Sequence, residues 1–148
     1  MKVAVLMGSP NDAPKMAGAV EMLERFGIQA DERVMSAHRN PGVVTEFASS
    51  ARDNGYVAII CGAGMAAHLG GVVAAHTTLP VIGVPLSGGG LNGVDALYST
   101  VQMPPGIPVA TVAIDGSKNA AILVAEMIAV TDESMAKQLD EFRAGGAK

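Results

Sequence analysis

Short apolar runs alternate along the chain with longer segments whose apolar residues recur every three or four positions. Five strands are predicted, at Lys2–Met7, Ala30–Met35, Tyr56–Cys61, Leu79–Val84 and Val109–Ile114. The second of them is apolar only at its end, Val34-Met35. The longer segments between them predict amphipathic helices. Strict alternation of this kind is typical of a parallel sheet with right-handed crossovers and helices on both faces. We therefore expect one α/β domain over residues 1–148, without an internal linker.

Capping residues bound the expected helices. Asp12 caps the first helix and Gly27 follows its end, whereas Asn40 caps the second helix and Pro41 takes its first position. Gly55 ends that second helix. Further helices are expected at Met65–Ala75, Gly93–Gln102 and Ser117–Val130. The apolar residues expected on the buried faces are Met16, Val20, Leu23, Val43, Phe47, Ala48, Ala51, Ala120, Val124 and Met127.

A last helix, with no strand after it, is predicted within residues 131–148, which form a C-terminal helix and tail. Thr131 caps this helix, and its apolar stripe consists of Met135, Leu139 and Phe142. The stripe could cover its own subunit or a neighbouring one, and the sequence leaves both arrangements open.

The composition is that of a folded domain without a general affinity for nucleic acid. Hydrophobic residues make up 49% of the chain, which excludes a disordered protein, and the net charge of −4 argues against a basic nucleic-acid-binding face. The opening apolar run stops at Gly8, and no run approaches membrane-spanning length. The single cysteine, Cys61, excludes an internal disulfide and fits a reducing compartment. We expect a cytoplasmic protein that binds neither nucleic acid nor membranes.

The middle of the chain is unusually poor in charge. Between Asp53 and Ser117 the only charged residues are Asp53, Asp95 and Asp115. Central strands that are buried on both faces explain part of this composition. They do not explain an apolar helical segment such as Ala66–Ala75, so we expect contacts between subunits as well.

The sharpest functional signal is the turn Ser36-Ala37-His38-Arg39, between the second strand and the second helix. In an open α/β sheet, ligands bind at the edge formed by the carboxyl ends of the strands. Histidine gains and loses a proton near neutrality, and arginine is a permanent cation suited to phosphate. An acid–base group at His38 beside an anion clamp at Arg39 makes this turn the predicted centre of the site.

Three other strand ends face the same edge, and each contains glycine: Gly8-Ser9, Gly62-Ala63-Gly64 and the segment 85–90. Glycine lets the backbone approach a ligand, helix N-termini offer free N–H groups to phosphate, and Ser9 adds a hydroxyl. The second of these segments lacks the third glycine and the later acidic residue of a Rossmann fingerprint, so no dinucleotide site is expected. Asp12 keeps two roles open, as a helix cap or as an acceptor for ribose hydroxyls.

No metal or cofactor is indicated. His68 and His76 are not spaced like zinc ligands, and Cys61 has no cysteine partner nearby. We expect structural roles for His76 and Cys61, whereas His68 lies one turn after the glycine loop and could belong to the site. With two Tyr, three Phe and no Trp, an aromatic cage for flavin is hard to build.

Six motifs occur in order along nearly the whole chain. They are Met7-Gly8-Ser9-x-x-Asp12, Ser36-Ala37-His38-Arg39-x-Pro41, Gly62-Ala63-Gly64-x-Ala66-Ala67-His68-Leu69, Leu79-Pro80-Val81-Ile82-Gly83-Val84-Pro85, Val101-Gln102-Met103-Pro104 and Pro108-Val109-Ala110-Thr111-Val112-Ala113-Ile114. Together they closely resemble the PurE family of purine biosynthesis. The resemblance implies a flavodoxin-like, three-layer α/β/α sandwich that assembles as a homo-octamer with active sites shared between subunits.

The resemblance also implies an isomerase. Such a mutase converts N5-carboxyaminoimidazole ribonucleotide to 4-carboxyaminoimidazole ribonucleotide by decarboxylation and recarboxylation in one pocket, without metal, ATP or cofactor. His38 would be the general acid/base, which protonates the substrate nitrogen as carbon dioxide leaves and then removes the ring-carbon proton. Ser9, Asp12 and Arg39 match the ribonucleotide-binding positions, and Asn11, where serine is common, can still donate to phosphate. The other pocket residues implied are Ser36, Gly62, Ala63, Gly64 and His68.

This chain departs from the family pattern after its third strand. Met65 replaces a common glycine and Gly70 a usual proline, and we expect Met65 to narrow the pocket or to repack an interface. Two alternative functions stay open. One is direct carboxylation of aminoimidazole ribonucleotide by carbon dioxide, which a related class performs, although the segments 36–39 and 66–69 favour the mutase. The other is a non-catalytic nucleotide-binding module of the same fold.

Overall fold

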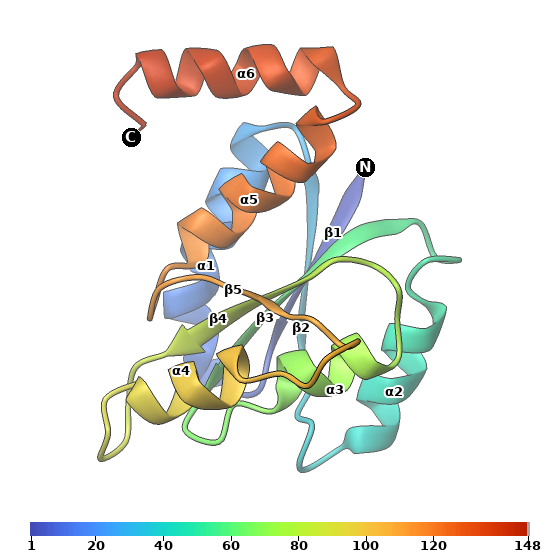
Figure 1. Cartoon of the computed structure of the whole chain (residues 1–148), viewed down its shortest axis with the longest axis vertical. Helices are drawn as coiled ribbons and strands as arrows, with labels where there is room; N and C mark the ends of the chain where they lie inside the picture. The colour runs from blue at the N-terminus through green and yellow to red at the C-terminus, as the bar shows by residue number, and fades with distance from the viewer. Residues whose placement is uncertain (148) are drawn as a thin grey trace.

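The computed structural model describes residues 1–147 and contains a five-stranded, all-parallel sheet with the order β2-β1-β3-β4-β5 (Figure 1). The strands are β1 (Lys2–Met7), β2 (Gln29–Val34), β3 (Tyr56–Gly64), β4 (Val81–Leu86) and β5 (Ala110–Thr111). Consecutive parallel strands need crossover connections, and each crossover here contains a helix. The predicted strand order along the chain is confirmed, together with its parallel pairing.

Helices cover both faces of this sheet, which confirms the three-layer α/β/α architecture. The helices are η1 (Pro10–Asp12, a 3₁₀ turn), α1 (Ala13–Arg25), α2 (Pro41–Ser50), α3 (Leu69–Ala75), α4 (Val94–Val101), α5 (Ser117–Ala129) and α6 (Glu133–Ala144). Figure 1 shows α1 and α5 side by side on one face of the sheet and α2, α3 and α4 on the other. Successive side chains of β1 point to opposite faces of the sheet, so this strand contributes to both cores. Val5 packs toward α1 and α5, and Leu6 packs toward α2 and α3.

The third helix is shorter than predicted. The sequence pattern indicates a helix over Met65–Ala75, whereas α3 begins at Leu69. The reason is that β3 continues through the glycine segment to Gly64, paired on one side with β1 up to Gly62 and on the other with β4. Met65 then adopts a left-handed backbone with φ of 55°, so helical geometry starts only after a turn.

The last strand is also shorter than predicted, and β5 pairs only with β4 at the edge of the sheet. Only Ala110–Thr111 of the expected run Val109–Ile114 forms regular pairs, and the chain then turns at Asp115, whose φ is 57°. At the neighbouring strand, Pro80 has no N–H to donate, and β4 begins after it.

The predicted capping residues need three corrections. The last helix is capped by Asp132 rather than Thr131, because the Asp132 carboxylate accepts a hydrogen bond from the Met135 N–H (3.0 Å). Asp12 and Asn40 occupy the positions before α1 and α2, but neither side chain caps its helix. Both side chains bond instead to the loop that precedes them.

Two residues of the predicted apolar stripes are exposed. Val43 of α2 is exposed, and its neighbour Val44 is buried against the sheet in its place. Met127 on α5 is also exposed, whereas Ala120 and Val124 of the same helix are buried as expected. The remaining stripe residues are buried or partly buried.

The C-terminal helix packs on its own subunit. Met135, Leu139 and Phe142 of α6 are buried in the core on the α1–α5 side, and the Phe142 ring meets the Phe26 ring edge to face at 5.6 Å. The predicted tail ends at Lys148, which lies outside the described residues. Within residues 1–147, no helix has both the length and the apolar character needed to cross a membrane.

Candidate active site at the carboxyl ends of the strands

A cleft of about 590 Å³ opens at the carboxyl ends of the first four strands. Four loops line it, which follow β1, β2, β3 and β4. The lining residues are Gly8, Ser9, Asn11, Asp12, Ser36, Ala37, His38, Arg39, Ala63, Gly64, Met65, Ala66, His68, Leu69, Ser87, Gly88 and Gly89. The edge where parallel strands end thus holds nine of the ten residues that the sequence singles out for the site.

Gly62 is the tenth residue, and it lies outside the lining. It sits within β3, paired with Met7 on one side and Val84 on the other. A Cβ atom at this position would collide with the thioether of Met16 on α1. The physical requirement for glycine at Gly62 is therefore the close packing of α1 on the sheet.

The turn at 36–39 is held by its own hydrogen bonds. The Ser36 hydroxyl oxygen accepts from the backbone N–H groups of His38 (3.3 Å) and Arg39 (3.2 Å). The side-chain carbonyl oxygen of Asn40 accepts a hydrogen bond from the Ser36 N–H at 2.6 Å. These bonds keep the turn compact and leave the two basic side chains on its outer surface.

His38 meets a second histidine in the cleft. Its Nε2 atom lies 2.7 Å from Nδ1 of His68, and the two rings stand nearly perpendicular, with centroids 4.9 Å apart. One nitrogen must donate the proton and the other accept it, since two neutral acceptors would form no bond. Both side chains are exposed, so the pair is accessible to a ligand in the cleft.

Arg39 places an exposed positive charge beside this pair of histidines. Its side chain is exposed and lines the cleft, and within residues 1–147 no carboxylate lies at ion-pair distance from its guanidinium. A guanidinium in this state can bind a phosphate with two parallel hydrogen bonds. The arrangement suits an anionic ligand.

Asp12 lies across the cleft on the first loop. Its carboxylate accepts a hydrogen bond from the Ser9 N–H (3.0 Å), and the Ser9 hydroxyl accepts one from the Asn11 N–H (3.2 Å). Partial burial raises the pKa of Asp12, although the Ser9 bond and the nearby charge of Lys15 oppose that shift. Burial therefore disfavours the ionised form of the Asp12 carboxylate. Its oxygens still have lone pairs that can accept hydrogen bonds from a ligand.

The loop after β4 forms a further wall of the cleft, and its anchors were not found from the sequence. The Lys15 ammonium on α1 donates to the Ser87 carbonyl oxygen and to the Ser87 hydroxyl (2.9 Å). The Asp115 carboxylate accepts from the Ser87 N–H at 2.9 Å. Burial alone would raise the pKa of Asp115, but the Ser87 hydrogen bonds and Lys15 outweigh it and lower that pKa. Ser87, which precedes the glycines at 88 and 89, is thus held by α1 and by the segment between β5 and α5.

The other predicted groups lie away from this cleft. Cys61 is fully buried, and burial raises the pKa of its thiol far above neutrality, so it stays protonated and inert. In residues 1–147 no three side chains of His, Cys, Asp or Glu are grouped so that they could hold a metal ion. His76 lines a different hollow at the opposite edge of the sheet.

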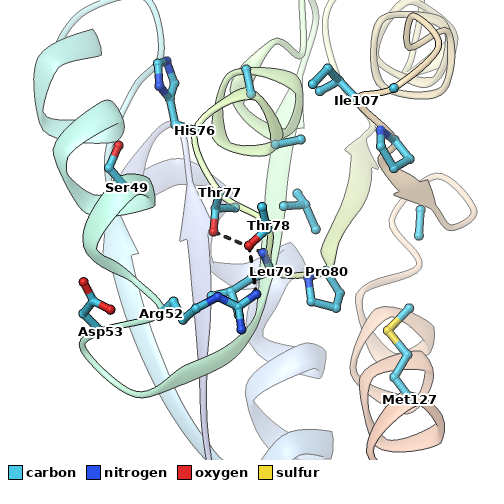
Figure 2. Close-up of a pocket in the computed structure, with 16 residues that line it drawn as sticks. Ser49, Arg52, Asp53, His76, Thr77, Thr78, Leu79, Pro80, Ile107 and Met127 are labelled. Carbon is cyan, nitrogen blue, oxygen red and sulfur yellow. Dashed lines mark hydrogen bonds between the residues drawn. The ribbon is translucent and has the colours of Figure 1, made fainter.

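That hollow, of about 920 Å³, lies at the amino ends of β4 and β5 (Figure 2). Arg52 reaches across it and donates to the Thr78 hydroxyl at 3.0 Å, while Asp53 and His76 stand apart at its rim (Figure 2). Those polar side chains are exposed and do not converge on one point. None of the residues predicted for the active site lines this hollow.

Comparisons with known proteins agree with this architecture. The model of the AIR carboxylase family matches residues 2–148. The N5-carboxyaminoimidazole ribonucleotide mutase of Vibrio vulnificus is 49% identical over 97% of this chain and 90% of its own length, and the protein of that name from Saccharolobus solfataricus is 52% identical over 95% and 89%. The crystal structure of Treponema denticola PurE superposes with a TM-score of 0.89 at 28% identity, over 99% of this chain and 91% of that one. The chain belongs to the AIR carboxylase family, the PurE family that its motifs resemble.

Proposed function

We propose that this protein is an isomerase of purine biosynthesis, which converts N5-carboxyaminoimidazole ribonucleotide to 4-carboxyaminoimidazole ribonucleotide in the cleft at the carboxyl ends of the strands. The observation that carries the proposal is that His38 and Arg39 line one cleft. The chain that contains them is about half identical to proteins named as this mutase. A proton-transfer group beside an anion site is what a ribonucleotide substrate of this kind requires.

His38 is the general acid and base of this reaction. As the bond between the exocyclic nitrogen and the carboxyl carbon breaks, carbon dioxide leaves and His38 protonates the nitrogen. The ring carbon then forms the new carbon–carbon bond to carbon dioxide, and the same imidazole removes the proton from that carbon. The proton that His38 donates to the nitrogen is balanced by the proton that it removes from the ring carbon, so the proposed cycle closes with one acid–base group. His68 holds the His38 ring through the 2.7 Å contact between their nitrogens.

The remaining cleft residues bind the substrate. Arg39, Ser9 and Asn11 bind its phosphate, since a guanidinium, a hydroxyl and an amide all donate hydrogen bonds. The Asp12 carboxylate accepts from the ribose hydroxyls. The residues that surround the base and the released carbon dioxide are Ser36, Ala63, Gly64 and His68, with Gly62 supporting them from within the sheet.

The protein assembles as a homo-octamer. An apolar stripe on and before α4 supports assembly, because Leu91, Val94, Tyr98 and Val101 are spaced on one side of the helix and are 43–63% exposed. A patch of large apolar side chains on a charge-poor segment is typical of a subunit interface. Sedimentation equilibrium should give eight times the 15.0 kDa of one chain, and Tyr98→Glu should lower that mass.

One assay separates the mutase from its alternatives. The purified protein is mixed with N5-carboxyaminoimidazole ribonucleotide at low bicarbonate, and formation of the 4-carboxy product is followed. The mutase forms product under these conditions, whereas a direct carboxylase forms it only from aminoimidazole ribonucleotide with added carbon dioxide. A non-catalytic nucleotide-binding module forms none in either mixture.

The carboxylase remains the second candidate for a specific reason. The protein named phosphoribosylaminoimidazole carboxylase from Candida glabrata is 50% identical to this chain, although the match covers only 25% of that longer protein. Identity alone therefore does not separate the two activities, and the low-bicarbonate assay does. A cytoplasmic location fits either enzyme and the free thiol of Cys61.

A further inference from the structure

Met65 occupies a backbone conformation that is costly for most residues other than glycine, asparagine and aspartate. Its φ is 55°, in the left-handed region where a Cβ atom crowds the following carbonyl oxygen. The conformation is fixed from outside the turn. The Ser99 hydroxyl on α4 accepts a hydrogen bond from the Ala67 N–H (3.0 Å) and lies 3.3 Å from the Met65 carbonyl oxygen.

The side chain of Met65 joins two walls of the cleft. Its Cγ and Sδ atoms lie 3.4 and 3.9 Å from the point that a Cβ on Gly89 would occupy, so the thioether rests on the backbone of the loop after β4. Both residues line the cleft. Because Met65 is also 62% exposed, its side chain lies at the mouth of the cleft rather than on its floor.

The loop that receives this side chain is itself fastened. Ser87, two residues before Gly89, is bound by Lys15 on one side and by Asp115 on the other. Met65 therefore connects two anchored loops. Its side chain packs on the loop after β4, and its backbone belongs to the turn that Ser99 binds. A flexible, unbranched thioether fills such an irregular gap well.

We infer that Met65 closes the mouth of the cleft and retains carbon dioxide between its release and its recapture. The inference rests on the proposed mutase function, in which the nitrogen–carbon bond of the substrate breaks before the new carbon–carbon bond forms. Free carbon dioxide carries no charge, so Arg39 cannot hold it. An apolar cover that slows its escape keeps the reactants together. A glycine at position 65 would remove the backbone strain, but it has no side chain and would leave the cleft without this apolar cover.

The test follows the carboxyl carbon through turnover. N5-carboxyaminoimidazole ribonucleotide labelled with ¹³C in the carboxyl group is converted in unlabelled bicarbonate, and the label in the product is measured by mass spectrometry. Wild type should retain the label. Met65→Gly and Met65→Ala should each raise the unlabelled fraction of product about threefold or more, whereas Met65→Leu, which keeps the volume of the side chain, should not.

Two further measurements separate closure from a structural effect. Met65→Gly relieves the left-handed backbone and should raise the melting temperature, but Met65→Ala should not, so a shared increase in label loss traces to the missing side chain. Asn92→Gly is the matched control, because Asn92 is also non-glycine with φ of 48° and lies outside the cleft lining. It should leave label retention unchanged.

Each outcome decides the inference. Wild-type label retention in both Met65→Ala and Met65→Gly would overturn it, as would equal label loss in Met65→Leu. If the wild-type protein forms no 4-carboxy product at all, the proposed function fails and the inference fails with it. That result differs visibly from a working enzyme whose Met65 variants retain the label.

Discussion

The Nε2 atom of His38 and the Nδ1 atom of His68 lie 2.7 Å apart, although the two residues are 30 positions apart in the chain. Two strands bring them together, because β2 ends just before the first histidine and β3 ends just before the turn that carries the second. A single proton lies between these nitrogens. The pair therefore fixes the orientation of the His38 ring and leaves its Nδ1 atom for another partner.

His38→Asn should remove turnover and leave the rest of the protein intact. The side chain is exposed and makes no core contact, so the melting temperature should stay within about a degree or two of wild type. Loss of the general acid/base should lower kcat by at least ~10², with substrate affinity retained. Steady-state kinetics and product binding by calorimetry measure the two effects. Full activity in this variant would remove His38 from the mechanism.

His68→Ala should act through the orientation of His38. We expect kcat to fall about tenfold with a smaller change in KM, because the partner that holds the imidazole is gone. His68→Asn keeps a polar atom near the position of Nδ1 and should recover part of the loss. The comparison of kcat between the two variants checks the positioning role, and equal losses in both would contradict it.

Arg39→Ala should weaken substrate binding without changing the chemical step. Removal of a charge-assisted hydrogen bond to phosphate costs about 1.5–3 kcal/mol, so KM should rise roughly tenfold or more while kcat changes little. Arg52→Ala is a suitable control, since Arg52 is another exposed arginine, at the opposite edge of the sheet. An unchanged KM in Arg39→Ala would rule out the phosphate contact.

The order of strands and helices could be read from the sequence because the apolar patterns of β1, β3 and β4 are strong and these central strands are buried. Errors fall where tertiary pairing overrides the local signal. The glycine segment 62–64 has the composition of a turn, yet all three of its residues pair with β4 and so belong to β3, which delays α3 to Leu69. Likewise the apolar run 109–114 predicts a longer strand than β5, because only Ala110 and Thr111 pair with β4.

Part of the candidate site could likewise be predicted from the sequence, and part could not. The turn at 36–39 was predictable, since three polar side chains follow an apolar strand end. The anchor of the glycine loop was not, because Lys15 resembles any lysine on a helix and its contact with Ser87 spans 72 positions of the chain. A partner that is chosen by packing leaves no local pattern in the sequence.

Asp12→Asn should raise stability and lower affinity. Partial burial raises the pKa of Asp12, so its ionised form is disfavoured in the folded protein at neutral pH. An amide oxygen can still accept from the Ser9 N–H without that penalty. The variant should unfold at higher denaturant concentration, and its KM should rise about tenfold if the carboxylate binds the ribose hydroxyls. A less stable variant with unchanged KM would contradict both parts.

Asp115→Asn should change how stability depends on pH. The Ser87 hydrogen bonds outweigh burial and lower the pKa of Asp115 in the folded protein, so its carboxylate stabilises the fold above its unfolded pKa. That contribution is lost as pH falls through the folded pKa. The wild-type protein should therefore be more stable than the variant near about pH 6, and the difference should shrink toward about pH 3.

Urea unfolding of both proteins at each pH measures this difference directly. Asp31 also has a lowered pKa, because its hydrogen bonds to Tyr56 and Arg33 outweigh burial, but it is common to both proteins and its contribution cancels in the comparison. Asparagine tolerates the left-handed φ of 57° at this position, so the variant isolates the charge from the backbone. A difference that stays constant from neutral to acid pH would show that the charge of Asp115 does not hold the Ser87 loop.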